Sequence, residues 1–224
     1  MKNAKRILCM ILVLTMVLTG CGGKQAESPA QSDNSGKTDN SSNTAKEETK
    51  KDSLVYGISG EPATFDPHMI SDNIASGIFY QVFDKLIRQE TDGALNPGLA
   101  ESWTLSDDGT VVTFKIRKNV KFHNGDTLTA DDVAFSLNRA IGSKFLASVV
   151  SMMDSAEVVD ESTVNLKLKF SYGPIYYNIT KISIVNKKAV EADAEGYGRK
   201  PIGTGAYKFV ELKSGDKIVC ERFD

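Results

Sequence analysis

The side chains in this sequence that could do acid–base chemistry are few, and they do not form a catalytic set. There are two histidines in the chain, His68 and His123. His68 lies in a predicted irregular loop from Glu61 to Met69 that contains Pro62 and Pro67, and functional groups are found disproportionately on loops. His123 precedes Asn124 in a turn sequence, where an imidazole more often is solvated or caps a turn than acts as a general base. His68 is therefore the better candidate for a functional role.

Other polar motifs have structural explanations. Adjacent carboxylates occur at 107–108 and 131–132, where a turn and a helix start favour acidic residues. The Gly-Thr-Gly segment at 203–205 lacks the third glycine and the following helix of a dinucleotide-binding loop, and no P-loop lysine follows it. No group of Cys, His, Asp and Glu has the spacing of a metal site. We expect a protein that is not an enzyme and that holds neither a metal nor a cofactor.

The sequence LTGC at positions 18–21 places a cysteine directly behind two small residues. It follows a basic start and an apolar run from Ile7 to Leu18, which is shorter than the roughly 20 residues that a membrane-spanning helix needs. These residues resemble the lipobox of bacterial lipoproteins. The resemblance implies a lipoprotein signal peptide over residues 1–20 and a lipid on the thiol of Cys21, whose acyl chains anchor the protein stably. The alternative is a signal peptide cleaved elsewhere, with Cys21 incidental.

The stretch after this cysteine has an unusual composition. Residues 24–52 contain no Val, Ile, Leu, Met, Phe, Trp or Tyr, so they cannot bury enough apolar surface to offset the cost of ordering. We predict that residues 21–52 form the lipid anchor and a disordered tether with a span of about 30 Å. The folded body is then expected to begin near Ser53, and its 172 residues suffice for one core.

Charge and the remaining cysteines exclude further classes. Without the predicted signal peptide the chain has 24 basic and 29 acidic residues, which gives no basic face for nucleic acid. Cys9 leaves with the signal peptide and Cys21 is lipidated, so Cys220 has no partner for an internal disulfide. We expect Cys220 to be a small buried apolar residue.

Hydrophobic periodicity predicts strands, hairpins and interspersed helices. The residues from Leu54 to Ile58 suggest a strand. Ser71 or Asp72 can cap a helix whose apolar positions run from 74 to 86. Thr129 caps a second helix with a near capping box. The other predicted elements are a hairpin over 103–116, a hairpin over 158–168, a short helical piece after 174, a helix over 186–193 and a hairpin over 206–222. This mixture indicates a mixed α+β or α/β fold.

Three stretches of the sequence resemble a known family. They are GEPATFDPH at 60–68, NPGLAESWTLSDDGTVVTFKIRKNVKFHNGDTLTADDVAFSLNRA at 96–140 and PIGTGAYKFVE at 201–211. In this order they resemble the family 5 extracellular solute-binding proteins of ABC importers, the oligopeptide and dipeptide class. The likeness extends over nearly all of residues 54–224, and the long central block is specific.

The resemblance implies the first lobe of a two-lobed, periplasmic-binding-protein type II-like fold. Residues 53–83 and 198–224 would belong to the main sheet of lobe I, and residues 84–197 to its subdomain. Members of the family are more than twice as long and continue into a second lobe. The resemblance therefore predicts an amino-terminal fragment in which the second lobe is absent.

The resemblance also implies a function and a site. The protein would capture extracellular oligopeptides or dipeptides and deliver them to the permease and ATPase subunits of an ABC importer, from the outer face of the cell membrane. The residues expected to face the ligand are Phe65, His68, Met69, Ile70, Ser71, Asp72, Asn73 and Thr204. Core packing is an alternative role for Phe65 and Ile70, and helix capping is one for Asp72.

Three alternatives to peptide binding stay open from the sequence. The same receptor fold could bind nickel, a metal chelate or an oligosaccharide. Two other classes of protein could carry such an anchor and tether. One is a lipid-anchored extracellular enzyme, which the missing catalytic set disfavours. The other is an adhesion module, which the lack of internal repeats disfavours.

Overall fold

The computed structural model describes residues 53–224, of which Leu54–Asp224 form one compact unit. The predictions of a signal peptide, of lipidation at Cys21 and of a disordered tether up to residue 52 lie outside the described residues. Within residues 53–224, no helix is both long and apolar enough to cross a membrane.

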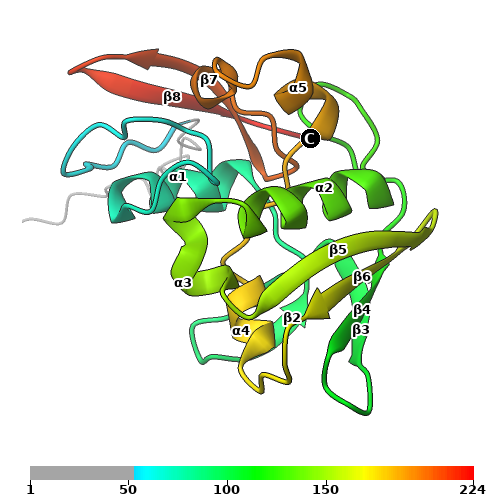
Figure 1. The fold of residues 1–224 in the computed structure, drawn as a ribbon. Helices are drawn as coiled ribbons and strands as arrows, with labels where there is room; N and C mark the ends of the chain where they lie inside the picture. The colour runs from blue at the N-terminus through cyan, green and yellow to red at the C-terminus, as the bar shows by residue number, and fades with distance from the viewer. Residues whose placement is uncertain (1–52) are drawn as a thin grey trace, which may run out of the picture. The chain divides into compact units, whose positions relative to one another are not determined.

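A four-stranded antiparallel sheet forms one face of the larger core (Figure 1). Its strand order is β3 (Ala100–Leu105), β4 (Val111–Ile116), β6 (Thr163–Leu168) and β5 (Met153–Asp160). Successive side chains of a strand point to opposite faces of the sheet, and the alternate residues Val112, Phe114 and Ile116 of β4 are all buried on its inner face. Gly109 has a φ of 70° in the turn between β3 and β4, a conformation that glycine adopts without strain.

Helix α2 (Ala130–Ile141) packs against this sheet, chiefly on β5 and β6 (Figure 1). The predicted capping box is present in full: Thr129 Oγ1 accepts from the amide of Asp132, and the Asp132 carboxylate accepts from the amide of Thr129. The buried face of the helix presents Val133 and Leu137 to the sheet. This capping explains where the helix begins, and its apolar stripe explains where it docks.

Shorter elements close the rest of this core. Buried apolar residues between Leu86 and Ile184 surround the sheet and α2, and we call this set the first cluster. Trp103 is partly buried against the first cluster and meets Tyr176 edge-on, at 6.1 Å between ring centroids. The elements that contribute are β1 (Ile87–Gln89), β2 (Leu95–Pro97), η1 (Lys144–Leu146), α3 (Ala147–Val150) and α4 (Ile175–Ile179).

A smaller second cluster lies around helix α1 (Asn73–Val82). Its buried members are Phe65, Ala75, Ile78, Phe79, Val82, Phe83, Val185, Val190 and Tyr197. Helix α5 (Lys187–Ala192), the 3-10 turn η2 (Tyr197–Arg199) and the hairpin of β7 (Tyr207–Lys213) with β8 (Lys217–Arg222) complete this region. Cys220 on β8 is half-buried against it. The division of the chain into a main sheet and a subdomain stays a prediction.

Most predicted elements are present, with four corrections. The predicted strand over Leu54–Ile58 is wrong: no strand forms there, and Val55 is 91% exposed because no neighbouring described strand pairs with it. The helix expected to reach Leu86 ends at Val82, since Phe83 is already extended, with a φ of −123°. The strand expected to start at Trp103 starts earlier, at Ala100, and the strand expected to start at Val158 starts at Met153.

Candidate functional site

The loop that precedes α1 runs largely through the interior of the protein. Phe65 is 2% exposed and packs on Phe209 with 4.9 Å between ring centroids, so the ring serves the second cluster. Its amide donates to the carbonyl of Gly198 at 2.8 Å. A Cβ at Gly198 would lie 1.9 Å from Thr64 Oγ1, so a larger residue there would displace the Thr64 hydroxyl. Core packing, the alternative role for Phe65, is thus its visible role here.

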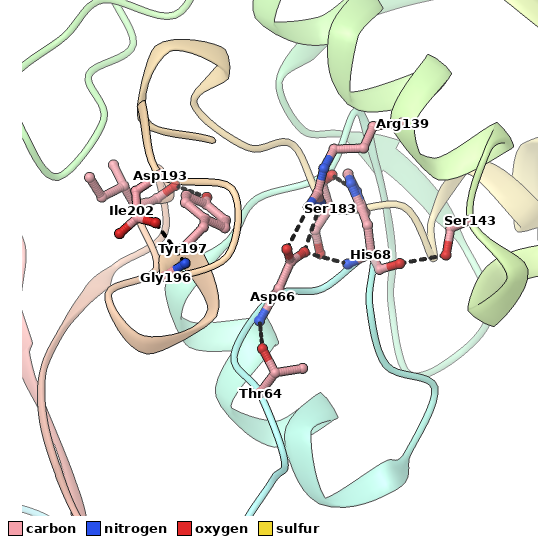
Figure 2. Close-up of polar contacts among 10 residues, drawn as sticks. All are labelled: Thr64, Asp66, His68, Arg139, Ser143, Ser183, Asp193, Gly196, Tyr197 and Ile202. Atoms are coloured by element: carbon pink, nitrogen blue, oxygen red, sulfur yellow. Dashed lines mark hydrogen bonds and ion pairs between the residues drawn. The ribbon is translucent and has the colours of Figure 1, made fainter. Parts of the chain in front are cut away.

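A buried ion pair ties this loop to α2. Arg139 donates from Nη1 to Asp66 Oδ1 at 2.7 Å and from Nη2 to Oδ2 at 2.5 Å, a two-point contact (Figure 2). The Asp66 side chain is 3% exposed and that of Arg139 is 18% exposed. Asp66 Oδ1 also accepts the amide of His68, at 3.0 Å. Since breaking such a pair leaves a buried charge, this contact fixes the loop strongly.

His68 lies behind this pair and is completely buried. Its Nε2 is 2.9 Å from the carbonyl oxygen of Ser183, and its own carbonyl accepts from Ser143 Oγ (Figure 2). The pKa of the ring is lowered to about 4, mainly by burial and also by the Arg139 guanidinium, while the Ser183 carbonyl and the Asp66 carboxylate oppose this. The ring is therefore neutral near pH 7. An entirely buried ring contacts no ligand directly in this conformation.

The following residues turn outward at the start of α1. Met69 is 49% exposed, and Ser71 and Asn73 are exposed as well. Ile70 packs partly against the second cluster. Asp72 caps the helix, because its Oδ1 accepts the amide of Ala75 at 2.8 Å. The predicted ligand-facing residues of this loop therefore divide into a buried anchor and an exposed run.

Thr204 lies on a different segment and holds a different partner. It is 8% exposed, and its Oγ1 donates to Asp84 Oδ2 at 3.0 Å. Burial raises the pKa of Asp84, and the Thr204 hydrogen bond opposes the rise. A Cβ at Gly203 or Gly205 would fall 2.0 Å from Val82 O or 2.3 Å from Gln81 O respectively, so both glycines serve backbone approach to the end of α1.

His123 has a structural role that its turn sequence did not indicate. Its Nε2 donates to the carbonyl of Gly205 at 2.9 Å, and its Nδ1 accepts the amide of Gly203 at 3.3 Å. The ring is half-buried and meets Phe223 edge-on, and burial lowers its pKa. The prediction of a solvated or capping side chain is thus wrong. The imidazole instead clamps the glycine-rich return to the turn at 122–126.

The structure groups the eight predicted site residues into two places. Phe65 and the residues from 68 to 73 lie on the loop before α1 and at the first residue of that helix, whereas Thr204 lies on a distant segment and bonds to Asp84. Sequence reasoning missed Arg139, Ser143 and Ser183, which hold this loop from segments far along the chain. A buried aspartate needs a partner, but no local sequence pattern tells that Asp66 is buried or which arginine pairs with it.

An open hollow of about 380 Å³ lies elsewhere, between α5, η2 and the 124–126 turn. Its polar lining includes Asn124, Asp126, Lys188 and Asp193, and none of the predicted site residues lines it. In the part of the chain that the structure describes, no three His, Cys, Asp or Glu side chains are placed to hold a metal ion.

Comparison with known structures first defines the class of protein. The oligopeptide-binding protein AppA of Bacillus subtilis, solved with a nonapeptide, matches with a TM-score of 0.66 and 31% identity over 74% of this chain and 35% of that one. Haemophilus influenzae OppA, in complex with RPPGFSPFR, matches with a TM-score of 0.67 and 28% identity over 73% of this chain and 36% of that one. The described residues therefore form a mixed α/β part of a solute-binding protein fold.

Sequence comparison then places the chain in a family. The family model described as bacterial extracellular solute-binding proteins, family 5 Middle, matches residues 94–224. Bacillus subtilis OppA is 31% identical over the whole of this chain and 43% of its own length, and Bacillus subtilis AppA is 29% identical over the whole chain and 41% of its length. This chain belongs to family 5 of the bacterial extracellular solute-binding proteins. It spans about two fifths of the length of these curated relatives.

Proposed function

We propose that this protein captures extracellular oligopeptides or dipeptides for an ABC importer, as its substrate-binding component. The observation that carries the proposal is that family membership coincides with structural likeness to two peptide complexes, those of AppA and OppA. A binding role also agrees with the geometry of the candidate loop, which has a rigid buried anchor and an exposed run beside it. The partners would be a membrane permease and its ATPase subunits.

Within this proposal the predicted residues take different parts. Met69, Ser71 and Asn73 expose their side chains and would contact the peptide directly. Phe65 and His68 would act from below by holding the loop, because both are buried. The other predicted residues, Ile70, Asp72 and Thr204, would border the site.

A nickel chelate is the second candidate ligand. Campylobacter jejuni NikZ, solved in complex with Ni(L-His), matches with a TM-score of 0.66 and 28% identity over 74% of this chain and 34% of that one. Because this likeness equals that to the peptide complexes, fold similarity alone does not separate the two ligand classes. The functional experiment therefore needs an arm for each.

Uptake by the producing bacterium tests the function. The reading frame is disrupted, and uptake of radiolabelled tripeptides and pentapeptides is measured beside uptake of ⁶³Ni with histidine. We expect peptide uptake to fall and to return when the intact frame is supplied in trans, with nickel uptake unchanged. Loss of nickel uptake alone would reassign the ligand, and unchanged uptake of both would contradict the proposal.

We further propose that the protein is held at the outer face of the membrane through a lipid on Cys21. The lipobox residues at 18–21 support this. Cells are grown with labelled palmitate, and the protein and its Cys21→Ala variant are isolated. We expect the label in the first and not in the second. Equal labelling of both would contradict lipidation at Cys21.

A further inference from the structure

We infer that His68 and the Asp66–Arg139 pair form an acid-released clamp, which holds residues 66–73 in place while the imidazole is neutral. The clamp brings three distant parts of the chain together: the loop before α1, the end of α2 and the segment around Ser183 (Figure 2). Its existence does not depend on the proposed ligand. Its effect on the exposed run beside it rests on the proposed function.

The hydrogen bonds of His68 fix its protonation. A carbonyl oxygen only accepts, so Nε2 must carry the proton that it shares with Ser183 O at 2.9 Å. Nδ1 then keeps a lone pair, and it has no hydrogen-bond partner among the described residues. A second proton would bind at Nδ1 and create a buried N–H without an acceptor. Leaving a buried donor unsatisfied is costly, so acid favours a state in which this ring is exposed.

The two charged groups nearest the ring act on its protonation in opposite directions. From α2 the Arg139 guanidinium faces the ring and repels an imidazolium, while from the loop itself the Asp66 carboxylate attracts one. These two groups are paired with each other, so their fields largely cancel. Tyr197 of η2 also faces the pair, and burial raises its pKa above the ordinary value, so it is neutral. Burial therefore dominates and leaves the pKa of His68 at about 4.

Release of the ring would loosen the whole loop. The contacts at stake are the Ser183 carbonyl with the ring, the Ser143 hydroxyl with the His68 carbonyl, and Asp66 Oδ1 with the His68 amide. Met69 follows directly, and Asp72 caps α1 three residues later. Opening this clamp therefore displaces the exposed run without requiring the first cluster to unfold.

The ring titration of the full chain is the first test. The sequence contains two histidines, so a His123→Gln variant assigns their carbon-bound ring resonances in an NMR spectrum. We expect the His68 resonance to titrate near pH 4 or to lose its native position there, about 2.5 units below a free imidazole at 6.5. Titration of His68 near pH 6.5 in the folded chain would overturn the inference.

Hydrogen exchange is the second test, with protection factors that correct for the intrinsic effect of pH. The amides of Phe65, His68 and Met69 report on the loop, since each donates to Gly198 O or to Asp66. Between pH 8 and pH 4 we expect their protection to fall by on the order of 100-fold, because the opened state takes up a proton that the closed state refuses. Amides of β4 and β6 should keep theirs.

A His68→Gln variant is the matched control. An amide side chain can still donate to the Ser183 carbonyl but does not titrate in this range. Its loop protection should change by less than a few fold between pH 8 and pH 4. An equal fall in the variant and the wild type, or simultaneous loss of protection in loop and sheet, would contradict a local clamp. If the titration and exchange results are as expected but disruption of the reading frame leaves peptide uptake unchanged, the proposed function is contradicted and the clamp is not.

Discussion

The first and second clusters reach stability in different ways. The first cluster buries 26 apolar residues, while the second buries 9. The first is a sheet covered by a helix, and alternation along β4 and β6 supplies much of it. Polar side chains also join distant segments in the first, as Asn138 does with the Ala156 backbone, but those of the second include buried or partly buried ionisable groups: Asp66 with Arg139, His68 with Ser183, and Thr204 with Asp84.

This difference separates packing from positioning. Apolar burial is non-directional and tolerates small displacements, whereas a two-point ion pair or a buried imidazole bond fixes a backbone at one place. The region with the smaller apolar core is also the one that carries the predicted ligand-facing loop. We interpret the polar contacts there as the means that hold this loop in a defined geometry.

The largest expected effect lies in the first cluster. Phe114 is fully buried at the centre of β4, so Phe114→Ala should lower the free energy of unfolding by about 4 kcal/mol through lost burial and a cavity. Urea denaturation at pH 7.5 measures this. Trp103→Ala is the control, and its effect should be smaller because Trp103 is only partly buried. A larger effect at Trp103 than at Phe114 would mean that the core is wrongly located.

The ion pair of the second region comes next. Arg139→Met should lower the free energy of unfolding by about 3 kcal/mol, because it leaves the Asp66 carboxylate buried without its partner. The double variant Asp66→Asn with Arg139→Met removes both charges and should recover part of this loss. An Arg139→Met variant as stable as the wild type would show that the ion pair does not fix the loop.

Acid sensitivity of stability should follow from His68. The folded pKa of about 4 lies below the unfolded value near 6.5, so the stabilising contribution is present above pH 6.5 and is lost as the pH falls toward 4. Between pH 7.5 and pH 4.5 we expect the wild type to lose about 2.5 kcal/mol more than His68→Gln. Identical pH profiles of the two proteins in urea denaturation would contradict this prediction.

The smallest effect is expected at a helix cap. Asp72→Ala should cost about 1 kcal/mol because the amide of Ala75 loses its acceptor, while Asp72→Asn should cost much less. Thr129→Ala at the start of α2 gives the matching value for the first cluster. Thermal unfolding measures all three. Equal losses for the alanine and asparagine variants at Asp72 would point to its charge rather than to its capping bond.

The sequence predicts elements better than it predicts the contacts between them. Turn chemistry and periodicity located the capped start of α2 and the hairpins, because these depend on neighbouring residues. The strand expected at Leu54–Ile58 failed because a strand needs a partner, which local sequence does not supply. Arg139 escaped notice as a loop partner because it lies 73 residues from Asp66. Burial of His68 could not be predicted either, because it depends on Ser143 and Ser183, which lie 75 and 115 residues away.

The exposure of Met69 offers the most direct test of the central claim, that the run beginning at Met69 faces the ligand. Met69 is 49% exposed, whereas Met152 and Met153 are 4% and 0% exposed and serve as internal controls.

Cells that carry the protein in its native setting are treated with brief pulses of hydroxyl radicals, with and without saturating peptide that their importer takes up. Mass spectrometry then measures the oxidation of each methionine. We expect peptide to reduce oxidation of Met69 several-fold and to leave Met152 and Met153 unchanged. Unaltered oxidation of Met69 under conditions where the same peptide is bound would contradict the account.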